Sequence, residues 1–191
     1  MTLALVSRAQ ERLDRYREEL AELSIEAITV KADAADNENL SEALGQLHSD
    51  LGDSQVLIYN AAKINNKDLS DLTAKEVQQE VQVGLEGALT AVRQVLPAMR
   101  AKGEGTLLFT GGGAATNPVA GAGLLSSTKA ALRMMTFTLA EELEGTGVRV
   151  GTVTIYGGIQ PGTPFDPDKI AERYWQLHSG EVRGVESEYR G

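Results

Sequence analysis

Short runs of apolar and β-branched residues alternate along this chain with longer segments in which apolar residues recur every three or four positions. The short runs predict strands over residues 2–7, 28–31, 55–59, 106–110 and 148–155. The longer segments predict helices over residues 10–23, 38–51, 73–102, 124–144 and 167–177. Strands that alternate with helices are typical of a parallel sheet covered by helices. We therefore expect one α/β domain spanning residues 1–191.

Two prolines refine the helix assignments. The apolar spacing between residues 73 and 102 is continuous, so we expect one long helix bent near Pro97, because proline disturbs a helix interior. Asp166 precedes Pro167, and an aspartate that caps free amides before a first-turn proline marks a helix start. Capping also accounts for Asp166 and Asp168 without a metal ion, so we expect no metal site.

Composition excludes several classes of protein. The 18 basic and 27 acidic residues give a net charge of −9, and the basic ones are scattered, so we expect no nucleic-acid partner. The chain has no cysteine, which removes disulfides, thiolate zinc sites and a cysteine nucleophile. No apolar run reaches the ~18 residues typical of a membrane span, and the opening run is too short for a signal peptide. We expect a cytoplasmic protein with no membrane partner.

Four motifs stand at strand ends or at a helix start: Ser7-Arg8, Ala32-Asp33-Ala34, Tyr59-Asn60-Ala61-Ala62 and the run from Ser126 to Leu132. In this order and spacing they resemble the short-chain dehydrogenase/reductase family over nearly the whole chain. The resemblance implies a Rossmann-like, doubly wound parallel sheet and an oxidoreductase that uses NAD or NADP.

That family opens with a strand and a TGxxxGxG turn whose amides, at a helix N-terminus, hold the cofactor pyrophosphate. This chain begins at what resembles the family's second strand, so we expect the sheet to lack the usual first strand and glycine-rich loop. The family's strand order, 3-2-1-4-5-6-7, places the first strand in the middle. Either its neighbours close up, another segment fills the gap, or the sequence is a truncated part of a longer gene product.

A glycine run from Gly111 to Gly113 offers an alternative phosphate-binding turn, because it follows a predicted strand. Residues 114–118 separate the run from the next helix, however, whereas a phosphate-binding turn leads straight into one. A turn of small residues at the carboxyl edge of the sheet explains the pattern without a ligand.

The family's catalytic group is an asparagine, a serine, a tyrosine and a lysine, in which the tyrosine transfers the proton and the lysine lowers its pKa. Lys129 matches the lysine. Leu125, Gly112 and Gly84 stand where the tyrosine, serine and asparagine are expected, and these residues cannot transfer a proton. The resemblance therefore implies a chain that is not catalytic as given.

The residues expected on the cofactor side are partly retained. Arg8 stands where enzymes that use NAD carry an acidic residue, and it suits the 2′-phosphate of NADP, although a surface arginine at a helix start has the same pattern. Asp33 would contact the adenine or simply end a strand. By resemblance, the NADP site comprises Ser7, Arg8, Asp33, Ala34, Asn60, Ala61, Ala62, Lys129, Gly157, Gly158 and Ile159.

Three functions remain open. The chain is an NADP-type oxidoreductase that is inactive or part of a longer enzyme, a non-catalytic binding or assembly module, or an enzyme that pairs Lys129 with Tyr59 or Tyr156. Each of these tyrosines could instead fill an emptied cleft. The sequence indicates no particular substrate.

The two long predicted helices, 73–102 and 124–144, are apolar on more than one face. One face can cover the sheet, and the other needs a second partner. The residues expected on that second face are Leu89, Val92, Met135 and Leu139. In the resembled family these helices pack against their copies about a two-fold axis, so we expect a homo-oligomer built on them.

Overall fold

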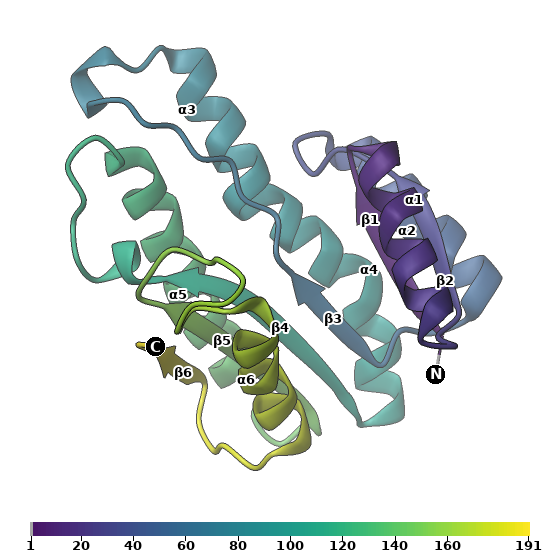
Figure 1. The fold of residues 1–191 in the computed structure, drawn as a ribbon. Coiled ribbons are helices and arrows are strands. Elements are labelled where there is room, and N and C mark those ends of the chain that lie inside the picture. The colour runs from purple at the N-terminus through teal and green to yellow at the C-terminus, as the bar shows by residue number, and fades with distance from the viewer. Residues whose placement is uncertain (1) are drawn as a thin grey trace.

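Parallel strands alternate with helices in the computed structural model, which describes residues 2–191 (Figure 1). The strands are β1 (Leu3–Ser7), β2 (Ala27–Lys31), β3 (Val56–Tyr59), β4 (Gly105–Gly112), β5 (Val148–Ile155) and β6 (Glu186–Tyr189). The helices are α1 (Gln10–Glu22), α2 (Asn37–Leu51), α3 (Ala74–Val81), α4 (Gly87–Lys102), α5 (Gly123–Glu142) and α6 (Pro167–Ser179). The α/β class and the predicted strands are confirmed. The last strand, β6, was not predicted.

The strands form two sheets. β1 pairs with β2, with Leu3 opposite Ala27, and a second sheet has the order β3-β4-β5-β6. Of the three outcomes expected for a missing central strand, the first two do not occur within residues 2–191. β1 and β3 do not pair, and no described segment lies between them as a strand.

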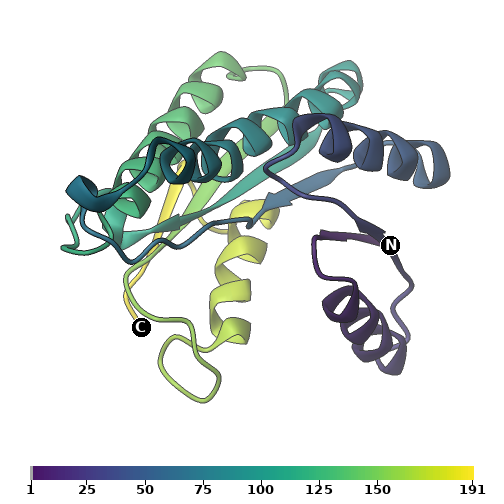
Figure 2. The same cartoon turned by 90° about the horizontal axis from the view of Figure 1, so that it is seen from above.

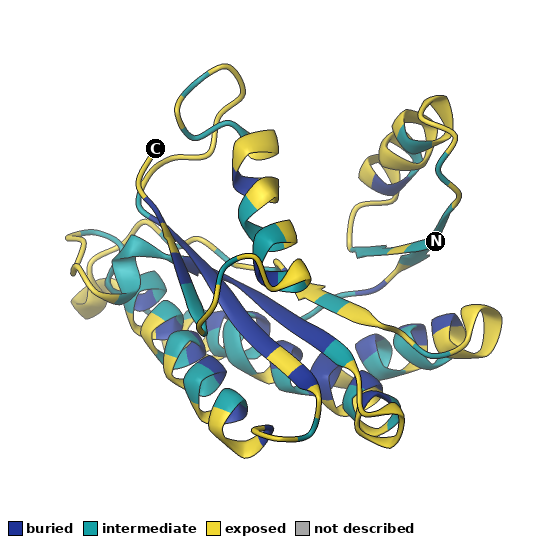
Figure 3. Ribbon diagram, turned by 90° about the horizontal axis from the view of Figure 1, so that it is seen from below, coloured by how far each residue is buried: buried dark blue, intermediate teal, exposed yellow. Residues whose placement is uncertain are grey.

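Helices cover the two faces of the sheets unequally. In Figure 2, α2, α3, α4 and α5 lie along one side, whereas α1 and α6 stand apart from each other on the opposite side. The main core forms between the larger sheet and helices α4 and α5, and it includes Leu107, Phe109 and Leu132. A smaller core, with Leu108 and Ile170, lies under α6. Dark blue, marking buried residues, runs along the middle strands of the larger sheet in Figure 3.

The segment predicted as one helix over 73–102 changes its hydrogen-bonding pattern partway along. Thr73 and Glu76 form a reciprocal capping box at its start. A wider π turn over Gln82–Glu86 separates α3 from α4, and Pro97 lies inside α4. Turns of this kind are frequent at functional sites. The segment is therefore interrupted at residues 82–86, a change that was not predicted, and it continues as α-helix through Pro97.

Helix α6 starts where the sequence predicts, with Asp166 as its N-terminal cap and Pro167 as its first residue. The Asp166 carboxylate accepts hydrogen bonds from the Asp168 amide at 3.0 Å and from the Gly162 amide at 2.6 Å. These bonds hold the pKa of Asp166 below its usual value. Within residues 2–191, no helix is long and apolar enough to cross a membrane, and no group of three or more acidic residues or histidines is placed to hold a metal ion.

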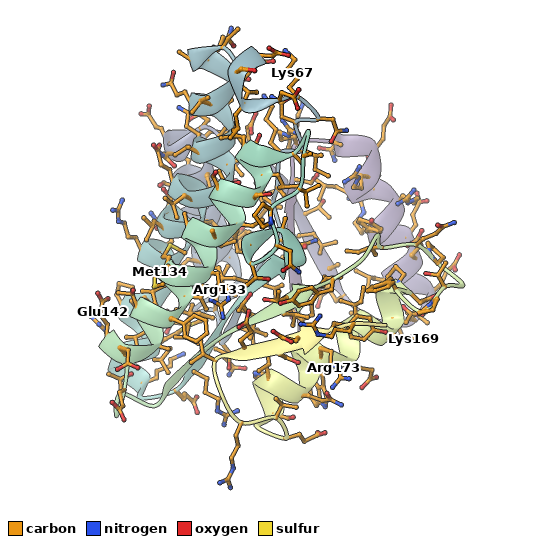
Figure 4. All side chains as sticks on the ribbon, turned by 90° about the vertical axis from the view of Figure 1, so that its left-hand side faces the viewer. Lys67, Arg133, Met134, Glu142, Lys169 and Arg173 are labelled. Carbon is orange, nitrogen blue, oxygen red and sulfur yellow. The ribbon has the colours of Figure 1, made fainter. Side chains whose placement is uncertain are left out.

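Of the four residues expected on a second apolar face of the long helices, two are buried inside the molecule, and Leu89 and Met135 are half-buried. Val92 and Leu139 are buried in the main core, and Met135 packs against it. They point inward because α4 and α5 both pack against the larger sheet. The large apolar side chain that α5 exposes is Met134, at 62% (Figure 4).

Candidate functional site

Lys129 reaches the carboxyl end of β4 from the first half of α5. Its Nζ donates a hydrogen bond to the backbone oxygen of Thr110 at 2.6 Å. Burial of the amine lowers the pKa of Lys129 to about 8, because removal from water disfavours the charged form. At a pH slightly above neutrality, a fraction of amines with this pKa is uncharged. Lys129 can therefore donate or accept a proton.

Thr110 connects residues from three other elements. Its hydroxyl donates to Asn60 Oδ1 at 2.7 Å and hydrogen-bonds with the Tyr174 hydroxyl at 2.6 Å. Burial raises the pKa of Tyr174 to about 12. The structure thus brings Asn60 and Lys129, both predicted, to one strand end. Tyr174 was not predicted. Its spacing from Ile170 and Leu177 marks the buried side of α6 but does not show which strand end it meets.

The positions matched to the family's catalytic group lie close together. Gly84, Leu125 and Lys129 line a cavity of about 10 Å³, room for about one water molecule. A Cβ atom on Gly112 would lie 4.0 Å from Lys129 Cγ, so a side chain has room there. A Cβ atom on Gly84 would lie 3.3 Å from Thr128 Cβ, which is tight.

Glu80 lines the same cavity and was not predicted. It is 1% exposed, its Oε1 lies 3.5 Å from the Thr128 hydroxyl, and its Oε2 has no hydrogen-bond partner among residues 2–191. Burial raises the pKa of Glu80, against smaller opposing effects of Thr128 and Lys63. A carboxyl group in this position holds its proton more tightly than one in water. The available sequence signal was the helical spacing of Glu80 from Val83, Gly87 and Ala91.

Tyr59 has a structural contact of its own. Its hydroxyl donates to the backbone oxygen of Val83 at 2.5 Å, at the π turn. Burial raises the pKa of Tyr59 well above its usual value, which opposes a role as a base. Gly87 makes room for it, since a Cβ atom there would lie 2.5 Å from the Tyr59 hydroxyl.

Tyr156 lies over the glycine run rather than against Lys129. Its hydroxyl lies 3.1 Å from the Thr116 hydroxyl and 3.1 Å from Glu188 Oε1, and Arg190 stacks 3.8 Å from its ring. A Cβ atom on Gly113 would lie 2.6 Å from the ring, so close packing accounts for that glycine. In residues 2–191, neither Tyr59 nor Tyr156 hydrogen-bonds to Lys129.

The residues expected around the adenine end of NADP lie at the carboxyl ends of β1 and β2. Arg8 and Asp33 approach to 4.0 Å as an exposed pair, and Asp33 Oδ1 also accepts from the Ala35 amide at 2.9 Å. The Ser7 hydroxyl accepts from the Ala9 amide at 3.3 Å. Ala34 instead packs toward α4, where its backbone oxygen would lie 2.4 Å from a Cβ atom on Gly87. Arg8 remains exposed and available to an anion.

The other expected cofactor residues belong to the larger sheet. Ala61 packs against the main core, and Ala62 lines the cavity at Lys129. Gly157, Gly158 and Ile159 follow β5 and are exposed. The expected NADP residues therefore fall into two groups, one on each sheet.

NADP fits these residues only in part. Its pyrophosphate needs amides at a helix start between the two groups. Within residues 2–191, no glycine-rich turn that leads into a helix lies in the space between strands β1 and β3. The glycine run does not substitute, because β4 continues through Gly112 and α5 starts only at Gly123. A larger cavity, of about 290 Å³ between Arg149 and Arg183, lies at the opposite, amino end of the strands.

Comparison with known proteins decides the family. The family model for short chain dehydrogenases matches residues 1–166. This chain belongs to the short-chain dehydrogenase family. The uncharacterized oxidoreductase YvrD of Bacillus subtilis is 33% identical over 148 residues, which are 76% of this chain and 55% of YvrD. The NADP-dependent 3-hydroxy acid dehydrogenase YdfG of Escherichia coli K12 is 29% identical over 83% of this chain and 62% of its own length.

Solved structures of short-chain dehydrogenases share the fold. A metagenomic short-chain oxidoreductase in complex with NADP aligns with a TM-score of 0.89 and 24% identity, covering 99% of this chain and 85% of that one. An alcohol dehydrogenase from Thermococcus sibiricus, complexed with 5-hydroxy-NADP, aligns with a TM-score of 0.86 and 25% identity. Both sheets of this chain thus sit as they do in those folds. The chain spans about half of the first curated relatives' length.

Proposed function

We propose that this short-chain dehydrogenase chain carries part of an NADP-type oxidoreductase and that residues 1–191 alone neither bind NADP tightly nor reduce a carbonyl. The observation that carries the proposal is the division of the expected NADP residues. Arg8 and Asp33 stand on one sheet, Asn60 and Lys129 stand on the other, and the described residues supply no phosphate-binding turn between them.

The chemistry at Lys129 supports the second half of the proposal. A carbonyl reductase must deliver a proton to the oxygen that becomes a hydroxyl. Leu125, Gly112 and Gly84 offer no group for this purpose. The two candidate tyrosines have hydrogen bonds elsewhere. Lys129 is thus left without the phenol whose pKa it would lower.

Calorimetric titration of NADP into the 191-residue chain tests the proposal. We expect no saturable heat in the micromolar range, because a helix N-terminus and its amides normally hold the doubly charged pyrophosphate. A cooperative unfolding transition of the same sample shows that the chain is folded. Micromolar affinity for NADP would overturn the proposal.

One observation favours a second function, an enzyme that uses Lys129 without NADP. The enclosed Lys129 amine has a pKa of about 8, which suits a base or a nucleophile. Activity that persists without NADP and disappears in Lys129→Met would support this function. A folded oligomer with neither activity nor dinucleotide affinity would instead support a binding or assembly module.

A further inference from the structure

A cavity lies under α6 at the amino end of the larger sheet. Its volume is about 290 Å³, far more than the ~10–15 Å³ that one water molecule needs. Sites for small ligands begin at about 300 Å³. The lining comes from the first halves of β4 and β5, the end of α6 and the segment that joins α6 to β6 (Figure 1). The cavity therefore has room for a small organic molecule.

The cavity is separate from the Lys129 site. Thr106 lines it, and the Thr106 hydroxyl hydrogen-bonds with His178 Nδ1 of α6 at 2.9 Å. Thr110, further along β4 on the same face, contacts both Tyr174 and Lys129. A rise of ~3.3 Å per residue puts ~13 Å between Thr106 and Thr110. A ligand in this cavity would not touch Lys129.

Apolar side chains form the inner wall of the cavity. Leu108 and Leu177 are buried in the smaller core, and Val182 packs against that core. On the outer side, Gly180 and Gly184 have φ angles of 81° and 116°, which favour glycine over residues with a side chain. The turn thus keeps side chains from filling the space. The part of a ligand that lies against the inner wall should be apolar.

Two arginines give the cavity a positive charge. Arg149 donates to the backbone oxygen of His178, where it offsets the partial negative charge at the end of α6. Arg183 has no ion-pair partner among residues 2–191. The described residues that line the cavity include no aspartate or glutamate. Glu181, near Arg183 in sequence, lies outside the lining and accepts a hydrogen bond from the Ser179 hydroxyl at 3.1 Å. About one positive charge is therefore left for a ligand.

We propose that this cavity binds a small organic carboxylate with an apolar chain. The carboxylate would lie between Arg183 and Arg149, and the chain would lie against Leu108 and Leu177. Guanidinium groups donate two parallel hydrogen bonds to a carboxylate. A singly charged group matches the positive charge left in the cavity better than a doubly charged phosphate ester does. An apolar chain covers the inner wall, which an inorganic anion would leave exposed to water.

The inference goes beyond the proposed function and does not depend on it. The cavity uses neither Lys129 nor Arg8, and it lies at the opposite end of the strands from the residues expected to hold NADP. Micromolar NADP affinity of the 191-residue chain would overturn the proposed function and leave this inference standing. Failure of a carboxylate to bind in the cavity would overturn this inference alone.

Titration of octanoate into the 191-residue chain, followed by NMR shifts of the backbone amides, tests the inference. We expect saturable shifts with a Kd below about 1 mM, concentrated at residues 106–108, 149–151 and 177–184. Acetate lacks the apolar chain and octanol lacks the charge, so each should bind at least about tenfold more weakly. No saturation, shifts centred on other residues, or equal binding of either control ligand would overturn the inference.

A matched pair of variants tests the role of the charge. Arg183→Gln should weaken octanoate binding at least about fivefold. It should leave octanol binding and the unfolding midpoint unchanged, because Arg183 is exposed. Arg93→Gln removes the same charge from an exposed position on α4, on the other side of the sheet, and should bind octanoate as the unmodified chain does. Equal octanoate affinity of the two variants would contradict the proposal.

Discussion

The larger sheet and the β1–β2 sheet are made of the same alternating units, yet they differ in how completely they are covered. Most residues of β4 and β5 are buried between α4 and α5 on one face and α6 on the other. No residue of β1 or β2 is fully buried. The Lys129 site lies on the larger, well-covered sheet, whereas Arg8 and Asp33 lie on the less covered β1–β2 sheet. Neighbouring units, more than the sequence of a strand, therefore decide how firmly a candidate site is held.

The largest expected effect compares a covered with an uncovered side chain. Phe109→Ala should lower the free energy of unfolding by about 3–5 kcal/mol, because Phe109 is fully buried in the main core. Ile58→Ala, on the neighbouring strand, should change it by no more than about 0.5 kcal/mol, because Ile58 is 53% exposed. Urea denaturation measures both variants. Similar losses in the two would show that the faces of β3 and β4 are equally covered.

Much of this fold could be predicted from the sequence because apolar spacing reports directly on burial. The strand β5, for example, has the expected bounds, Val148–Ile155. β6 escaped prediction because its sequence, Glu-Ser-Glu-Tyr, is mostly polar. Ser187 and Tyr189 are nevertheless buried, and Glu186 is paired with Arg133 at 2.5 Å. Tertiary contacts outweigh local preference in such a strand.

The candidate site could be predicted only where motifs mark it. Lys129 and Asn60 were predicted because the family motifs stand at strand ends, and the structure joins both to Thr110. Tyr174 was missed because α6 returns from far along the chain to meet β4. Glu80 was missed because a glutamate inside a helix is usually exposed, and burial depends on packing against α5.

Glu80 and Glu76, on the same helix, should give opposite pH dependence. Burial raises the folded-state pKa of Glu80, so its contribution to stability is present at low pH and lost as pH rises through that pKa. Hydrogen bonds from Lys67 and Thr73 lower the pKa of Glu76 to about 2, so its contribution is present near neutral pH and lost in acid.

Matched glutamine variants test this contrast by urea denaturation from about pH 4 to about pH 8. Glu80→Gln should gain stability over the unmodified chain as pH rises, because it removes a carboxyl group that must ionise in a buried place. Glu76→Gln should lose stability relative to the unmodified chain over the same rise. Parallel pH profiles for the two variants would refute burial as the cause of a raised Glu80 pKa.

The smallest effect on folding is expected at the outer face of the covered region. We propose that α5 contacts a second copy of the chain, and Met134 is the large apolar side chain it has available, since Val92, Met135 and Leu139 pack within the molecule. Met134→Asp should convert a dimer at micromolar concentration to a monomer and leave the free energy of unfolding within about 0.5 kcal/mol. Leu23→Asp, at the end of α1 and 70% exposed, is the control and should leave the dimer intact.

Light scattering distinguishes these states, and a 20.4 kDa monomer of the unmodified chain would contradict the proposal. Because one exposed methionine provides little apolar area, the dimer should be weak, dissociating on dilution before either sheet unfolds.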